Sequence, residues 1–140
     1  MRLIQKTLLI STGLFVVVVI GLLVYFENNK EFEPTISIDD VEIRNEYLKL
    51  REFPYWTFVG EAKNNSSTTV DSLSFKIRAY DCPTDTVGPD CEIIGEEVVN
   101  TYVTIPEGQV RRFVDMVTFT DMPVPKNEFK WAYELINIGL

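Results

Sequence analysis

The chain of 140 residues contains no histidine, and this absence excludes several kinds of chemistry. Ser–His and Cys–His nucleophile arrangements cannot form, and most transition-metal sites lose their usual imidazole ligand. A Gly-rich phosphate loop with a Walker-type lysine is also missing. Carboxylate pairs such as Asp39-Asp40 and Glu96-Glu97 are adjacent, so a strand would point their side chains to opposite faces. We therefore expect a protein that has no cofactor and is not an enzyme; a small enzyme is the least supported alternative.

Positive charge is scarce beyond the first 26 residues. The segment from Glu27 to Leu140 holds all 21 Asp and Glu but only 11 of the 13 Lys and Arg, a formal charge of −10. Nucleic-acid binding needs a basic face, so nucleic acid is not an expected partner. Docking onto anionic lipid is disfavoured for the same reason. The composition is typical of a soluble, acidic exterior.

Cysteine is limited to Cys82 and Cys91, which bracket the turn-rich segment from Pro83 to Asp90. Two thiols without a histidine cannot complete a tetrahedral metal site, and the CxxC spacing of redox pairs is absent. We predict a structural disulfide that closes a hairpin tip in an oxidising compartment. The chain-entropy model gives such a bridge roughly 2–3 kcal/mol of stabilisation. A metal or redox pair is the alternative.

The one long apolar run is uncharged from Thr7 to Phe26, 20 residues, which is the length of a membrane-spanning helix. A cleaved signal peptide has a shorter apolar core and small residues at its cleavage site, and neither is found here. A buried soluble helix would need a polar stripe. We predict an uncleaved signal anchor. Its apolar residues are Leu8, Leu9, Ile10, Leu14, Phe15, Val16, Val17, Val18, Val19, Ile20, Leu22, Leu23 and Val24.

Charges beside the run predict its orientation. Arg2 and Lys6 precede it, whereas three glutamates outnumber Lys30 after it. The positive-inside rule then places the N-terminus in the cytoplasm and the rest in the periplasm or outside the cell, on a single-pass protein of the inner (cytoplasmic) membrane. The expected divisions are a cytoplasmic N-terminus (1–6), a transmembrane helix (7–26), a tether (27–34) and an extracytoplasmic β-sandwich domain (35–140).

Beyond the tether, apolar and polar residues alternate with the period of half-buried strands. The parity changes at Asp39-Asp40, as a bulge or kink would cause. Asp115 shares the inward parity of its strand, so we expect a bulge or a strand edge there. About seven short antiparallel strands are typical of an all-β, two-sheet sandwich or a barrel. The alternating segments are Ile36–Ile38, Val41–Ile43, Tyr55–Asn64, Leu73–Tyr80, Ile93–Ile105, Val110–Thr120 and Phe129–Leu135.

The inward parity also predicts the core. Aromatic residues on it could instead bind a sugar or peptide, but core packing is the simpler interpretation. A functional tyrosine is more to be expected among Tyr47, Tyr55, Tyr80 and Tyr102, which have outward parity or lie in loops. The predicted core is Trp56, Phe58, Leu73, Phe75, Ile77, Val103, Ile105, Phe113, Val117, Phe119, Trp131, Tyr133 and Leu135.

Part of this pattern resembles the FxLYD-type domain of exported bacterial proteins. The resemblance rests on Val59-Gly60 through Asn64, on the strand ending Ala79-Tyr80-Asp81, and on the turn Pro106-Glu107-Gly108 before Phe113. Ala79 is smaller than the residue usual in that family, and the turn after Asp81 is longer. The resemblance implies an Ig-like or fibronectin-III-like sandwich in the cell envelope. It implies no catalytic site, because that family shares none.

The cysteine hairpin is rich in carboxylates, which are ligands that calcium accepts. The spacing does not match an EF-hand loop, so an exposed acidic turn is the simpler interpretation and calcium is the alternative. The candidate ligands are Asp81, Asp85, Asp90 and Glu92.

The short tether suggests a domain held against the membrane. We therefore expect a non-catalytic accessory or scaffold subunit of a larger membrane assembly. Its partners would be the lipid bilayer, through one helix, and other membrane or envelope proteins. The alternative is a stand-alone extracytoplasmic module that binds a peptide, glycan or ion through its loops.

Overall fold

The computed structural model describes residues 36–140, and the predicted anchor (7–26) and tether (27–34) lie outside them. A compact unit begins at Thr35 and runs to Leu140. Within residues 36–140, no helix is both long and apolar enough to cross a bilayer. The elements are η1 (Ile38–Asp40, a 3-10 helix), β1 (Val41–Glu52), β2 (Tyr55–Asn64), β3 (Val70–Cys82), β4 (Glu92–Ile105), β5 (Val110–Thr118) and β6 (Glu128–Gly139).

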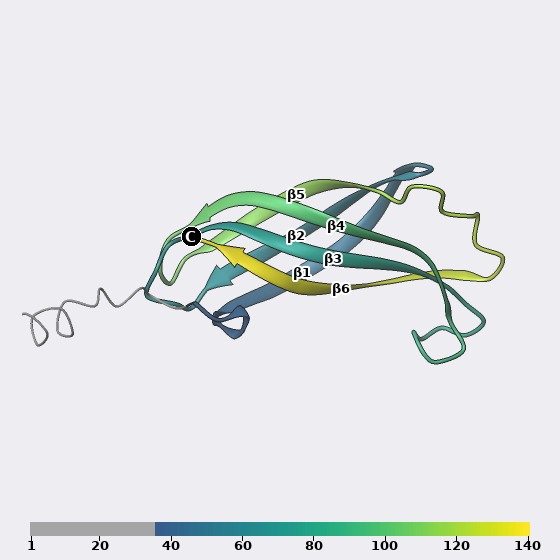
Figure 1. Ribbon diagram of the computed structural model, residues 1–140, viewed down its shortest axis with the longest axis horizontal. Helices are drawn as coiled ribbons and strands as arrows, with labels where there is room; N and C mark the ends of the chain where they lie inside the picture. The colour runs from purple at the N-terminus through teal and green to yellow at the C-terminus, as the bar shows by residue number, and fades with distance from the viewer. Residues whose placement is uncertain (1–35) are drawn as a thin grey trace, which may run out of the picture. The chain divides into compact units, whose positions relative to one another are not determined.

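The six strands form two antiparallel, three-stranded sheets, in the orders β1-β2-β5 and β4-β3-β6 (Figure 1). One buried cluster takes residues from both sheets, so the sheets face each other across a shared core. Phe58 of β2 and Phe75 of β3 meet at its centre, with ring centroids 5.2 Å apart. The all-β, two-sheet architecture expected from the alternation is confirmed.

The central strands bury every second side chain, as their period of two requires. Nine of the thirteen predicted core residues are buried, and Val103, Trp131, Tyr133 and Leu135 are half-buried against the same cluster. Gly60 lies inward on β2 beneath the Phe113 ring, where an added Cβ would stand 2.5 Å from Cζ. That close approach lets β5 pack tightly at this point.

The segment before β1 is a 3-10 turn and not the strand with a bulge or kink at Asp39-Asp40 that the alternation predicted. Ser37 caps a 3-10 turn: its Oγ accepts from the Asp39 N–H at 3.3 Å, and Asp40 accepts from the Ser37 N–H at 2.9 Å. These local hydrogen bonds compete with strand pairing, so the first separate strand is absent from residues 36–140 and six strands form where about seven were expected. The parity change at Asp39-Asp40 is real, but a turn causes it.

Strand β1 carries a β-bulge at Asn45, where the register with β2 shifts between Arg44 and Tyr47. Asn45 has a φ of 52°, which asparagine tolerates better than most residues. The bulge advances the chain by one residue, so Tyr47 points outward beside Val59 while Leu48 pairs with Phe58 and packs on the core.

Asp115 lies at the edge between β5 and β4. Its Oδ2 accepts a hydrogen bond of 2.6 Å from Thr101 Oγ1, a buried hydroxyl of β4. Both strands are terminal in their sheets, so this bond joins the two sheets along one side. The strand edge expected at Asp115 is confirmed.

Candidate functional site

The outer face of the β1-β2-β5 sheet carries an apolar row and, next to it, a mixed row, and the strand registers align both. Tyr47, Val59 and Val114 are direct cross-strand neighbours in the first row. Val59 is only 5% exposed although it points outward, whereas Val114 is 58% exposed. In the next row Thr57 lies between Lys49 and Met116. The face is therefore an apolar stripe rather than the fully polar surface usual on the solvent side of a sheet.

Basic side chains surround this stripe. Lys49, Arg51 and Arg112 line, with the apolar residues, a shallow depression of about 510 Å³. Five of the ten Lys and Arg in residues 36–140 lie on this one face. We call the part of this face around the depression the docking face; three of the five basic residues lie in it, and Arg44 and Lys63 lie outside it. The docking face comprises Tyr47, Lys49, Leu50, Arg51, Thr57, Val59, Arg112, Val114 and Met116.

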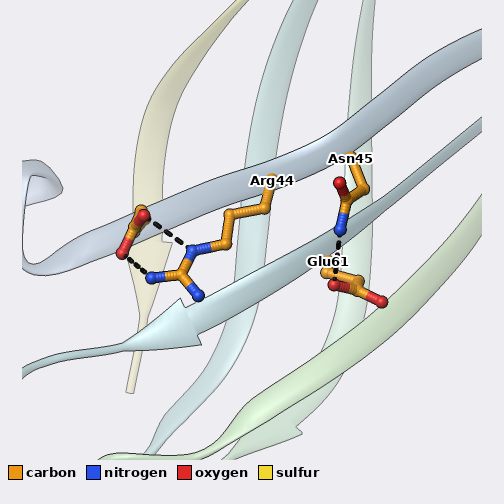
Figure 2. Close-up of polar contacts among 4 residues, drawn as sticks. Arg44, Asn45 and Glu61 are labelled. Atoms are coloured by element: carbon orange, nitrogen blue, oxygen red, sulfur yellow. Dashed lines mark hydrogen bonds and ion pairs between the residues drawn. The ribbon is translucent and has the colours of Figure 1, made fainter.

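The carboxylates near the start of the face have partners of their own (Figure 2). Arg44 Nε donates to Glu42 at 2.6 Å, which lowers the pKa of the Glu42 carboxyl group. Asn45 Nδ2, positioned by the bulge, donates to Glu61 Oε2 at 2.9 Å. By contrast, Lys49, Arg51 and Arg112 form no ion pair with any residue from 36 to 140. Their charges are available to a partner.

The outer face of the β4-β3-β6 sheet is organised differently, because its charges pair with one another. Arg78 binds Glu96 at 2.7 Å and lies 3.7 Å from Glu134, and Lys130 binds Glu128 at 2.7 Å. The Glu96 hydrogen bond raises the pKa of Arg78, and the Glu128 hydrogen bond raises that of Lys130. This face offers less unpaired charge than the docking face.

A second depression follows the β4–β5 edge and is mainly polar. It has a volume of about 470 Å³, and Glu97, Asn100, Asp115 and Thr118 are among its lining residues. Tyr102 borders it and is 85% exposed, the largest value among the exposed large hydrophobic residues of the described chain. The depression thus combines an exposed ring with amide, hydroxyl and carboxylate groups, the mixture of apolar and polar groups that lines ligand sites.

The hairpin after β3 is closed by the predicted disulfide between Cys82 and Cys91, which is confirmed. Asp81, just before it, is 7% exposed and accepts from the Lys126 N–H at 2.9 Å and the Asn127 N–H at 2.8 Å. The Lys126 N–H has the largest effect on the pKa of Asp81 and lowers it; burial partly opposes this, and the Asn127 N–H adds to it.

The proposed calcium ligands are not brought together as a set. Asp81 is committed to backbone amides, whereas Asp85, Asp90 and Glu92 are exposed on the hairpin. In the part of the chain that the structure describes, no three Asp, Glu, Cys or His side chains converge to hold a metal ion. The hairpin therefore acts as a structural clasp between β3 and the loop before β6.

The strand parity predicted which aromatic residues pack in the core and which are exposed. Trp56 stacks on Phe129 with centroids 4.2 Å apart, and Trp131 and Tyr133 pack on Phe58. Burial and the nearby Glu46 carboxylate raise the pKa of the Tyr133 phenol. Tyr47 and Tyr102, by contrast, are exposed at the two depressions.

Sequence reasoning missed the docking face. Lys49 and Arg112 are far apart in the chain, and only the pairing of β1 and β5 with β2 brings them to one surface. The outward parity of Tyr47 was the one available signal. No protein-family model matches the chain, and no curated protein matches it.

Proposed function

We propose that the chain is a non-catalytic, single-pass protein of the cytoplasmic membrane that holds an Ig-like sandwich outside the cytoplasm. In this role it is an accessory or scaffold subunit of a larger membrane assembly. The apolar run at residues 7–26 and its flanking charges support the anchor and its orientation. The resemblance to FxLYD-type domains supports the Ig-like assignment.

The docking face carries the proposal. Its apolar stripe exposes Val114 and Met116, 58% and 65% respectively, on the side of the domain where the basic residues gather. Residues 36–140 hold 18 acidic and ten basic side chains, so a basic apolar face is the exception on this surface. Exposed apolar area with a charged rim is characteristic of protein–protein contacts. Charge complementarity points to a partner protein with an acidic and apolar surface.

The test compares the full-length protein with two charge-reversed variants after gentle extraction from its membrane. In the face variant, Lys49→Glu and Arg112→Glu reverse two docking-face charges. In the control variant, Arg111→Glu and Lys76→Glu make the same change in charge at positions outside the face. Arg111 is the chain neighbour of Arg112 but has the opposite strand parity.

The wild type and the control should elute with the same defined set of membrane subunits, identified by mass spectrometry, and the face variant should elute without them. A wild type that elutes without other subunits would remove the scaffold role. A face variant that keeps the full set would show that another surface makes the contact.

A second candidate function, glycan or peptide binding, is favoured by the exposure of Tyr102 beside the polar depression. It predicts that a soluble form of the domain binds an envelope oligosaccharide or peptide by itself. Tyr102→Ala should then abolish binding in a calorimetric titration, while Tyr55→Phe should not change it.

A further inference from the structure

Strand β6 ends its sheet and leaves one long edge unpaired. It spans 12 residues and pairs only with β3, and it runs along the border of the sandwich in Figure 1. An edge strand of this length offers a row of free backbone N–H and C=O groups to another strand. The neighbouring edge, β1, is interrupted by the bulge at Asn45.

The inward side chains of β6 are less covered than their counterparts on β3. Leu73, Phe75 and Ile77 of β3 are fully buried, whereas Trp131 and Tyr133 of β6 stay half-buried although they pack on the core. On the opposite side of the sandwich, the hydrogen bond between Thr101 and Asp115 joins the edges of the two sheets. The β6 side is thus where an added strand would cover apolar surface.

The usable part of the edge is its N-terminal two-thirds. The register with β3 shifts beside Leu135, and η1 lies next to β6. The middle of a strand that pairs with β6 therefore has to lie opposite a residue before Leu135. Ala132, a small residue, lies at the middle of the remaining stretch from Glu128 to Leu135.

We propose that β6 pairs antiparallel with β6 of a second copy of this chain, with the two-fold axis at Ala132. In this register Lys130 lies opposite Glu134 of the second copy, and Glu134 lies opposite Lys130 of the second copy. Trp131 lies opposite Tyr133 of the second copy on the inward side. Opposite charges and aromatic pairs are favourable when they are direct cross-strand neighbours.

The charge pattern selects this register and favours a second copy over an unrelated strand. A shift of the axis to Trp131 would place Glu128 opposite Glu134 of the second copy, and a shift to Tyr133 would leave Lys130 opposite Ile136. Glu134 is 59% exposed in its side chain and lies 3.7 Å from Arg78, so it can accept Lys130 of another chain. Lys130 would exchange its own Glu128, at 2.7 Å, for that partner. The dimer joins two sheets into one of six strands and uses none of the docking face.

The first test is cysteine cross-linking of the full-length protein in its own membrane. Ala132→Cys should give a dimer on mild oxidation, because the two Ala132 positions meet on the axis. Lys130→Cys and Glu134→Cys should each give little dimer alone and should cross-link when both chains are co-expressed. Lys76→Cys, on the outer face of the central strand β3, is the matched control and should stay monomeric.

The second test checks the proposed register by reversing the charges that it places opposite each other. Adding Lys130→Glu to the Ala132→Cys protein should reduce the cross-linked fraction at least several-fold. Further addition of Glu134→Lys should restore it, because the swapped pair is again complementary. Absence of the Ala132→Cys cross-link, or a cross-link that is insensitive to Lys130→Glu, would overturn the proposal.

Discussion

At the scale of single residues, Asn64 shows how one side chain joins three segments. It is fully buried, and its Nδ2 donates to Thr68 O at 2.7 Å and to Ile105 O at 2.8 Å. Its Oδ1 accepts from the Ser66 N–H at 2.9 Å and from Ser66 Oγ at 2.7 Å. A buried amide with every hydrogen bond made stabilises the turn after β2 and holds the end of β4 against it.

Replacement of Asn64 by alanine should therefore be costly. Asn64→Ala removes the Nδ2 donor from the Thr68 and Ile105 carbonyl groups, of which Thr68 O keeps only Ser66 Oγ at 2.9 Å. We expect the free energy of unfolding to fall by about 2–3 kcal/mol. The neighbouring Asn65 is exposed, and Asn65→Ala should change the free energy of unfolding by less than about 0.5 kcal/mol. Urea unfolding of Thr35–Leu140, followed by tryptophan fluorescence, measures both. Equal effects at the two positions would contradict this role of Asn64.

The residue pattern in the sequence predicted part of this region. The run Asn64-Asn65-Ser66-Ser67 is typical of a turn, because these side chains bond to nearby backbone groups. The burial of Asn64 was not predictable in the same way, since one of its partners, Ile105 O, is 41 residues away. The types of the neighbouring residues predict the turn, whereas the burial of Asn64 depends on distant strands that pack on the turn.

At the scale of elements, Asp81 fixes the loop before β6 to the end of β3. Its carboxylate accepts from two backbone N–H groups, at Lys126 and Asn127, and these hold its pKa below the usual value. Because β6 begins at Glu128, the clamp also determines where the last strand enters the sheet. The disulfide at Cys82 closes the adjoining hairpin. The chain is therefore held at two neighbouring residues where β3 ends, Asp81 and Cys82.

The lowered pKa gives the Asp81 clamp a defined pH dependence. A group with a lower pKa in the folded state stabilises the protein above its unfolded pKa of about 3.9 and loses that effect as the pH falls through the folded pKa. Asp81→Asn should thus be less stable than the wild type at about pH 7, and the gap should narrow at about pH 2.5. Urea unfolding at both pH values measures this. Asp90→Asn, exposed on the same hairpin, is the control; a gap that is constant with pH would refute the role of the Asp81 charge.

Strand alternation predicted most elements well. The Tyr55–Asn64 segment coincides with β2, and the other alternating runs lie within or beside β3 to β6. The second half of β1 was not predicted, because the bulge at Asn45 interrupts its period and Lys49 to Glu52 is exposed. That half of β1 contributes Tyr47, Lys49 and Arg51 to the docking face, which explains why the face could not be found from the sequence.

At the scale of the whole molecule, net charge and local charge give opposite indications. The acidic composition argued against nucleic acid and anionic lipid as partners, yet folding gathers half of the basic residues in 36–140 on one sheet face. Paired charges on the other sheet leave its β6 edge as the second feature available for association. The docking face and the β6 edge belong to different sheets, so the two proposed contacts can exist together.

The separation of these surfaces predicts that their disruptions are independent. Effects of substitutions without shared partners are usually additive, and Arg112 and Lys130 share no contact among the described residues. Arg112→Glu should reduce association with membrane subunits and leave the Ala132→Cys cross-link unchanged. Lys130→Glu should reduce the cross-link and leave the subunits bound. Quantitative mass spectrometry and cross-linking of the same membranes measure both. If Lys130→Glu also releases the subunits, the assembly requires the dimer, and the two surfaces form one functional unit.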